Sequence, residues 1–181
     1  MVHYGEEPPT LDSNMNSSLI KVLLLICLSP LAFFASGESI YQQSMLRLNS
    51  SNHEKPVKQT LANFQGKPLI TAFFMPNCRW CQRQHKALKK LHQHCPNIQT
   101  VMLGVQGSKQ KLRKALQREK NTFPAYVANN TIIKAIGSKS PVPMMLFFNT
   151  QGTLVFKTVG YTPEPKLTAL FTQHNINVCS A

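Results

Sequence analysis

The sequence lacks the additional residues that cysteine-containing zinc and haem sites require. It contains no second CxxC motif and no histidine pair with zinc-finger spacing, which excludes an ordinary zinc finger. Gln82, rather than histidine, follows the one CxxC motif at Cys78–Cys81, which excludes covalent haem attachment. No basic stretch alternates with aromatic residues, as a surface that stacks nucleotide bases would require. No internal repeat is found, so a repeat architecture is not expected.

Acidic residues are also scarce, with 7 Asp and Glu against 20 Lys and Arg. The positive excess is concentrated in two segments, Arg79–Lys90 and Lys109–Lys120. Such a balance suits nucleic acid, an anionic membrane surface or an acidic protein partner. Because the leader described next directs the chain to export, no nucleic-acid partner is expected. A basic helix face in contact with solvent is the simplest interpretation, with an acidic protein or an anionic membrane as the candidate partner.

Residues 1–37 are interpreted as a leader that does not belong to the folded domain. Leu19–Ala35 is almost entirely apolar and is followed by small residues, which is the order of a secretory signal peptide. The segment from Met15 resembles an export n-region, so translation is expected to start there. A transmembrane anchor is the alternative, but Pro30 and the small residues favour cleavage. We expect a periplasmic protein of bacterial type, soluble after cleavage or anchored by an uncleaved segment.

The part of the chain after the leader is predicted to hold one domain. Residues 38–57 are polar and weakly patterned, so they are expected to form a flexible segment in front of a domain at residues 58–181. Four cysteines lie in the exported part, namely Cys78, Cys81, Cys95 and Cys179. An even set of cysteines suits an oxidising compartment, in which disulfides persist.

Hydrophobic periodicity predicts strands and helices in alternation, which indicates an α/β fold. Strands are expected at residues 69–74, 98–105, 123–127, 144–148 and 153–159. Helices are expected at residues 79–94, 109–120, 131–136 and 163–174. The nearly continuous apolar run at residues 69–74 indicates a strand buried on both faces, as in a parallel sheet.

The CxxC motif lies where the first of these long strands gives way to a helix. A helix N-terminus carries about half a positive charge, which stabilises a thiolate on the first cysteine. We therefore assign Cys78 as the nucleophile and Cys81 as the cysteine that resolves the mixed disulfide. Arg79 and His85 add positive potential, which is expected to lower the pKa of Cys78 below the free-thiol value of about 8.5. A static disulfide or half of a zinc site is the alternative.

With these elements in place, the chain resembles the thioredoxin superfamily over about residues 58–172. The closer likeness is to its exported, TlpA-like or ResA-like thiol-disulfide oxidoreductases. The motifs that carry it are Phe64–Pro68 before the first long strand, Cys78–Cys81, Val142-Pro143 and Gly152 in the last hairpin. The resemblance implies a thioredoxin fold, with a central mixed sheet flanked by helices in a single domain.

The resemblance also implies a substrate site around the cysteine pair. Pro143 matches the cis-proline of the family, which faces the two cysteines and leaves backbone groups of Val142 to bind an extended substrate segment. Cys78 is expected to be the exposed sulfur of the pair. Trp80 is interpreted as part of the docking surface, with simple cover of apolar surface as the alternative.

Cys95 and Cys179 follow the first and last helices of the predicted domain. In the thioredoxin fold these helices pack on one face of the sheet and run the same way, so their ends meet opposite the active site. We therefore predict a structural disulfide between Cys95 and Cys179, with two free or intermolecular thiols as the alternative. A metal site that combines them with His92, His94 and His174 is the weaker hypothesis, and neither a metal nor a cofactor is expected.

Several positions depart from the family. Asn77 stands where an aromatic residue usually precedes the first cysteine, and Lys86 replaces a proline that kinks the helix. Ala72 stands where thioredoxins bury an acid, and only Gln106 lies near the position of a buried glutamate in TlpA-like reductases. The proton of the second cysteine is thus left with water or His85 as its acceptor. These residues are consistent with a reductase and with an oxidase.

The function that these observations predict is thiol-disulfide exchange with protein thiols or disulfides. Such an enzyme also needs a redox partner that recharges the CxxC pair. The first alternative is a non-catalytic thioredoxin scaffold that binds a partner through its basic faces. The second is a metal chaperone that uses the same cysteines.

Overall fold

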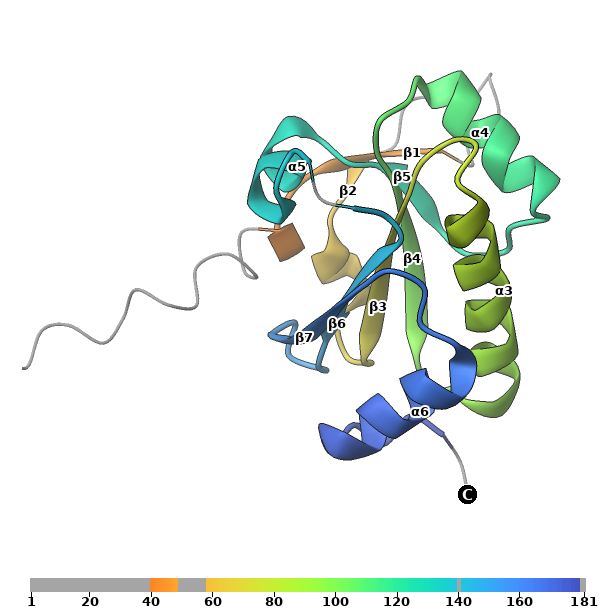
Figure 1. The fold of residues 1–181 in the computed structure, drawn as a ribbon. Coiled ribbons are helices and arrows are strands. Elements are labelled where there is room, and N and C mark those ends of the chain that lie inside the picture. Colours follow the sequence, from red (N-terminus) through yellow and green to blue (C-terminus); the bar gives the residue numbers. More distant parts are fainter. Residues whose placement is uncertain (1–39, 49–57, 140, 180–181) are drawn as a thin grey trace, which may run out of the picture. The chain divides into compact units, whose positions relative to one another are not determined.

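A seven-stranded mixed sheet forms the centre of the fold (Figure 1). The computed structural model describes residues 40–48, 58–139 and 141–179. Across the sheet, the strands are β2 (Lys58–Gln59), β1 (Met45–Arg47), β5 (Ala125–Val127), β4 (Gln99–Gly104), β3 (Leu69–Phe74), β6 (Met144–Phe148) and β7 (Leu154–Val159). The strand β4 runs parallel to β3 and β5, whereas β1, β2, β6 and β7 pair antiparallel with their neighbours.

Helices cover both faces of this sheet (Figure 1). One face carries α3 (Arg79–His94), α4 (Lys109–Arg118) and α6 (Glu164–Gln173). The other carries α5 (Asn130–Ile136) and the short 3-10 helix η1 (Leu61–Phe64). Within the described parts of the chain, no helix has the length and apolar character needed to cross a membrane. The predicted arrangement, a central mixed sheet flanked by helices, is confirmed.

The strand β3 is the middle of the hydrophobic core, because its side chains are buried on both faces. Ile70, Ala72 and Phe74 point into the cluster that α3, α4 and α6 cover. Leu69 and Phe73 point into the cluster on the opposite face. Burial of a leucine or phenylalanine side chain stabilises a fold by about 1.5–3 kcal/mol, so this strand holds the two layers together.

The neighbour of β3 on one side, β6, determines what lies beside the CxxC motif. The two strands are antiparallel, and Met144 at the start of β6 pairs with Phe73 near the end of β3. The segment in front of β6 therefore lies at the carboxyl end of β3. The helix α3 begins at that same end.

Helix limits agree with the sequence prediction at most ends and differ at the end of α4. Ser108 caps the start of α4 as predicted, because its Oγ accepts a hydrogen bond of 3.3 Å from the N–H of Lys111. The helix stops at Arg118 rather than at residue 120. Lys120 has φ +48°, a left-handed conformation that a right-handed helix does not allow.

The N-terminal part of the sheet reaches further than the predicted domain start at residue 58. Residues 38–57 were expected to be flexible, yet Met45–Arg47 form β1 between β2 and β5. The reason is that Met45 and Leu48 are 1% exposed, so this polar segment contributes apolar side chains to the core. The predicted leader, residues 1–37, lies outside the described residues.

Candidate active site

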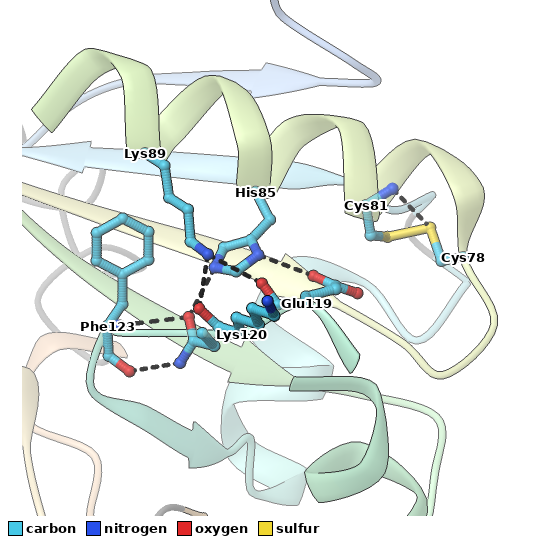
Figure 2. Close-up of polar contacts among 8 residues, drawn as sticks. Cys78, Cys81, His85, Lys89, Glu119, Lys120 and Phe123 are labelled. Atoms are coloured by element: carbon cyan, nitrogen blue, oxygen red, sulfur yellow. Dashed lines mark hydrogen bonds and ion pairs between the residues drawn. A yellow bond between two sulfur atoms is a disulfide. The ribbon is translucent and has the colours of Figure 1, made fainter. Parts of the chain in front are cut away.

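The CxxC motif forms the N-terminus of α3 (Figure 2). Cys78 is the N-cap residue, and its Sγ accepts a hydrogen bond of 3.1 Å from the backbone N–H of Cys81. The two sulfurs are joined in a disulfide, with the Cα atoms 5.2 Å apart. A backbone N–H and the positive end of the helix dipole thus point at Cys78 Sγ. Both favour a thiolate there once the disulfide is reduced.

Both cysteines are buried, which corrects the expectation of an exposed Cys78. The exposed fraction is 7% for Cys78 and 3% for Cys81. The cause is the chain segment in front of β6, because Cys78 Sγ lies 3.9 Å from the carbonyl oxygen of Val142. Only a narrow approach to Cys78 is therefore open from the solvent.

Val142 and Pro143 lie beside the cysteine pair, joined by a cis peptide bond. The antiparallel pairing of β6 with β3 brings them there. The carbonyl oxygen of Pro143 accepts a hydrogen bond of 2.8 Å from the N–H of Gly160, which ties them to the segment after β7. Pro143 is buried and Val142 is partly exposed, so Val142 is the one that faces the surface.

An open concavity of about 380 Å³ lies next to the cysteine pair, between Trp80, Val142, Pro143, Gly160 and Tyr161. Trp80 and Tyr161 form its aromatic side, with ring centroids 6.0 Å apart. Their exposed fractions are 50% and 40%, which are large values for aromatic side chains. The sequence analysis missed Tyr161, because only the strand order brings the residue that follows β7 to the start of α3.

Arg79 and His85, the residues assigned to lower the pKa of Cys78, lie in different surroundings. Arg79 is exposed on the first turn of α3. His85 is 1% exposed, and its ring nitrogens face polar partners. Nδ1 lies 3.0 Å from Oε2 of Glu119 (Figure 2). Nε2 lies 2.8 Å from Oδ1 of Asn121. The role of both residues toward Cys78 stays a prediction.

Glu119 is a residue of this site that the sequence analysis did not identify. It caps the C-terminus of α4, and no local pattern places it near α3. The ammonium group of Lys89 joins the two helices, because it donates hydrogen bonds of 2.9 Å to the Glu119 carbonyl and 2.6 Å to the Lys120 carbonyl. A cation at the C-terminal carbonyls of a helix is favourable, since that end is negative.

The departures from the family have local structural explanations. Asn77 has φ +61°, a conformation that asparagine adopts more readily than an aromatic residue does, and its Oδ1 accepts a hydrogen bond of 3.2 Å from Arg118. Ala72 pairs with Met102 and Met145, so the strands contribute no acid beneath the cysteines. Gln106 and Lys86 are exposed. Gln106 therefore does not replace a buried glutamate.

At the far end of α3, a disulfide joins Cys95 and Cys179. The histidines near this end have other partners. His92 Nε2 lies 2.9 Å from Thr100 Oγ1. The His174 ring stacks on the Phe156 ring, with the ring centroids 4.3 Å apart. Among the described residues, no group of three His, Cys, Asp or Glu side chains is placed to hold a metal ion.

Comparison with known proteins agrees with this geometry. The sequence model of the thioredoxin-like domain matches residues 56–175, which is more than half of the chain. No curated protein sequence matches. Among solved structures, the fold is similar to that of a secreted Mycobacterium tuberculosis disulfide oxidoreductase homologous to E. coli DsbE. The TM-score is 0.60 and the identity 16%, over 74% of this chain and 96% of that one.

Two further structures have the same fold. Mycobacterium tuberculosis DsbF, solved in mixed oxidized and reduced forms, has a TM-score of 0.62 and 16% identity, over 75% of this chain and 97% of that one. StoA from Bacillus subtilis has a TM-score of 0.53 and 14% identity, over 70% of this chain and 95% of that one. Sequence identities this low support a shared fold only, whereas the match to the domain model shows the family. The chain belongs to the thioredoxin-like family, and its structural neighbours include thiol-disulfide oxidoreductases.

Proposed function

We propose that this protein is an exported thiol-disulfide oxidoreductase that exchanges disulfides with protein substrates through Cys78 and Cys81. One observation carries the proposal. Cys78 Sγ receives the N–H of Cys81 at the start of α3 and lies beside Val142, at the edge of an open aromatic concavity. A static disulfide needs neither the thiolate-stabilising N–H nor the adjoining concavity.

In the reductive direction, the Cys78 thiolate attacks a substrate disulfide and forms a mixed disulfide, while the other substrate sulfur leaves as a thiolate. The Cys81 thiol then loses its proton and attacks Cys78 Sγ. This second attack forms the Cys78–Cys81 bond and breaks the bond to the substrate. Two electrons have passed from the pair to the substrate, and a dithiol partner must return them. The oxidative direction is the same sequence reversed.

The concavity between Trp80 and Tyr161 is the proposed binding site for the substrate segment that flanks the reacting sulfur. Val142 and Pro143, which lie beside Cys78, line the same concavity. The guanidinium of Arg83 lies 4.6 Å from the Trp80 ring centroid, which holds the indole in place by a cation–π contact. An extended peptide that passes Val142 would rest its side chains on these two rings.

Export is part of the proposal and rests on the apolar run Leu19–Ala35 with the small residues after it. We propose a periplasmic location of bacterial type, with the protein soluble after cleavage or held by an uncleaved segment. N-terminal sequencing of the protein recovered from a periplasmic extract tests this. A mature terminus near residue 36 or 38 supports cleavage, and a protein confined to the cytoplasm contradicts export.

The test of the activity compares the native protein with Cys78→Ser in two assays, reduction of insulin and oxidation of a dithiol peptide. The proposal expects activity in at least one assay and its loss in the variant. The reduction potential of the pair then assigns the direction. A value near −270 mV, roughly that of thioredoxin, indicates a reductase, and one near −120 mV, roughly that of DsbA, indicates an oxidase.

A second candidate function is favoured by a basic concavity of about 370 Å³ on the α4 side of the cysteine pair. It is lined by Pro76, Asn77, Lys111, Lys114, Gln117 and Arg118. Three cations without an acid in this lining suit an acidic protein segment, so the chain would be a binding module on a thioredoxin scaffold. Full biological function of Cys78→Ser, with no activity in either assay, would support this candidate.

A further inference from the structure

The buried His85 ring has a hydrogen-bonding pattern that determines where its protons lie. Asn121 Nδ2 donates a hydrogen bond of 2.6 Å to the Phe123 carbonyl, and Asn121 Oδ1 accepts one of 3.3 Å from the Phe123 N–H. The amide orientation is thereby settled, and Oδ1 is the atom that faces His85 Nε2 at 2.8 Å. Because Oδ1 only accepts, Nε2 must carry a hydrogen.

The second ring nitrogen then faces a carboxylate. His85 Nδ1 and Glu119 Oε2 are 3.0 Å apart, with side-chain exposures of 1% and 14%. Since Nε2 is a donor to Asn121, Nδ1 is the ring nitrogen that forms the contact with the carboxylate. His85 is thus buried and Glu119 partly buried, and the Glu119 carboxylate oxygen that does not contact His85 can accept a proton.

This pair lies next to the cysteine that has to lose a proton. Cys81 and His85 are four residues apart on the inward face of α3, a spacing that puts Cβ atoms about 5–6 Å apart. In the view of Figure 2, the Glu119 carboxylate lies on the side of the His85 ring that faces the disulfide. Cys81 is 3% exposed within an apolar cluster, so bulk water reaches its sulfur poorly.

The other charged groups around the pair do not compete for this proton. Lys89 directs its ammonium at the Glu119 and Lys120 carbonyls, and Arg118 contacts Asn77. His92 Nε2 lies 2.9 Å from Thr100 Oγ1, and the Phe123 ring contacts both histidines. The strands β3 and β4 beneath α3 carry no titratable side chain.

We propose that Glu119, held in place by His85, accepts the proton of Cys81 when that thiol attacks the mixed disulfide, an inference that rests on the proposed function. The Cys81–Cys78 bond forms, the bond from Cys78 to the substrate breaks, and the substrate leaves as a thiolate with the electron pair. The proton passes to Glu119, which then releases it to solvent or to the departing thiolate. His85 is the positioning residue.

The test separates the two attacks in the full chain with Cys78–Cys81 reduced. Cys27, in the predicted leader, is replaced by serine (Cys27→Ser) so that it does not react. A nitrobenzoate disulfide reacts with Cys78 and releases one coloured thiolate, and attack by Cys81 releases a second. Glu119→Gln should leave the first release unchanged and slow the second by about 100-fold at neutral pH. The difference should narrow at pH values well above about 8.5, where thiols ionise without help even in apolar surroundings. Glu119→Asp, which keeps a carboxylate, should recover part of the rate.

Glu164→Gln is the matched control. Oε1 of Glu164, on α6, lies 3.8 Å from Nδ1 of His94, which is at the end of α3 away from the cysteines. This variant should leave both releases unchanged. The proposal is overturned if Glu119→Gln matches the native second release, or slows it equally at every pH as a packing defect would. In the native protein alone, a second release that follows an ordinary thiol titration near pH 8.5 overturns it as well. A native protein with no second release contradicts the proposed function itself.

Discussion

Gln84 and Thr162 bind each other through two buried hydrogen bonds. Gln84 Nε2 donates to the Thr162 carbonyl at 3.0 Å, and the Thr162 N–H donates to Gln84 Oε1 at 2.8 Å. One side chain of α3 thus satisfies both backbone groups of a residue in the loop between β7 and α6. That loop carries Tyr161, so the pair also holds one wall of the proposed substrate concavity in place.

Gln84→Leu should lower the free energy of unfolding by about 2–4 kcal/mol, because it leaves a buried N–H and a buried carbonyl without partners. Urea unfolding followed by circular dichroism measures this. Gln93→Leu, at an exposed position of the same helix, is the control and should change stability by less than about 0.5 kcal/mol. Equal effects of the two substitutions would show that the paired hydrogen bonds contribute nothing.

Gly152→Ala should destabilise the fold more than Gly66→Ala does. Both glycines have positive φ, +82° and +96°, so alanine costs about 1–2 kcal/mol at each. At Gly152 a Cβ would also lie 2.5 Å from the Tyr41 ring, whereas nothing lies within 4 Å of one at Gly66. The crowding adds about 1–3 kcal/mol at Gly152 alone. Similar thermal unfolding midpoints for the two variants would contradict this difference.

Stability should decline toward acid pH partly because of His92. Burial lowers the pKa of His92 in the folded protein below its ordinary value of 6.5. As the pH falls through 6.5, the unfolded chain therefore binds a proton at this residue before the folded chain does, and the free energy of unfolding decreases. Above about pH 7.5 both states are neutral there, and the contribution is constant.

His92→Gln keeps a partner for Thr100 and removes this titration. The free energy of unfolding, measured from pH 7.5 to pH 5, should therefore decline less steeply than in the native protein. Gln93→Ala, at an exposed position of the same helix without a titratable group, is the control and should leave the slope unchanged. A decline in His92→Gln as steep as in the native protein would assign the acid sensitivity to other groups.

Replacing Cys95 and Cys179 together by alanine should lower the free energy of unfolding by about 4 kcal/mol on the chain-entropy account, because the disulfide spans a sequence separation of 84 residues. The rate of exchange at Cys78 should stay within about twofold, since the two pairs lie at opposite ends of α3. Chemical denaturation and stopped-flow mixing measure the two quantities. An unchanged stability would mean that the bond adds no constraint to the unfolded chain.

Local sequence patterns were sufficient to predict the elements that carry the cysteines. The apolar run of β3 and the periodic face of α3 occupy the expected residues, because each is specified by its own side chains. The mixed sheet was predicted from the resemblance alone, since no local pattern states which strands are neighbours. The short strand β1 was not predicted, because three residues of mixed character show no period.

The polar half of the candidate site was much harder to predict. Gln84 and His85 are polar residues on a buried helix face, and their burial is favourable only because Thr162, Glu119 and Asn121 supply hydrogen bonds from distant segments. Those partners have no spacing relation to α3 in the sequence. Their contribution becomes visible only when the sheet has brought α3, α4 and the β7–α6 loop together.

The basic concavity beside Asn77 also bears on the speed of encounter. Lys111, Lys114 and Arg118 form a positive surface near the narrow approach to Cys78. Such a field attracts acidic proteins over about 8 Å at physiological salt and orients them before contact. Acidic substrates would therefore be captured faster than basic ones of equal intrinsic reactivity. Selection among substrates would begin during diffusion, before any sulfur has reacted.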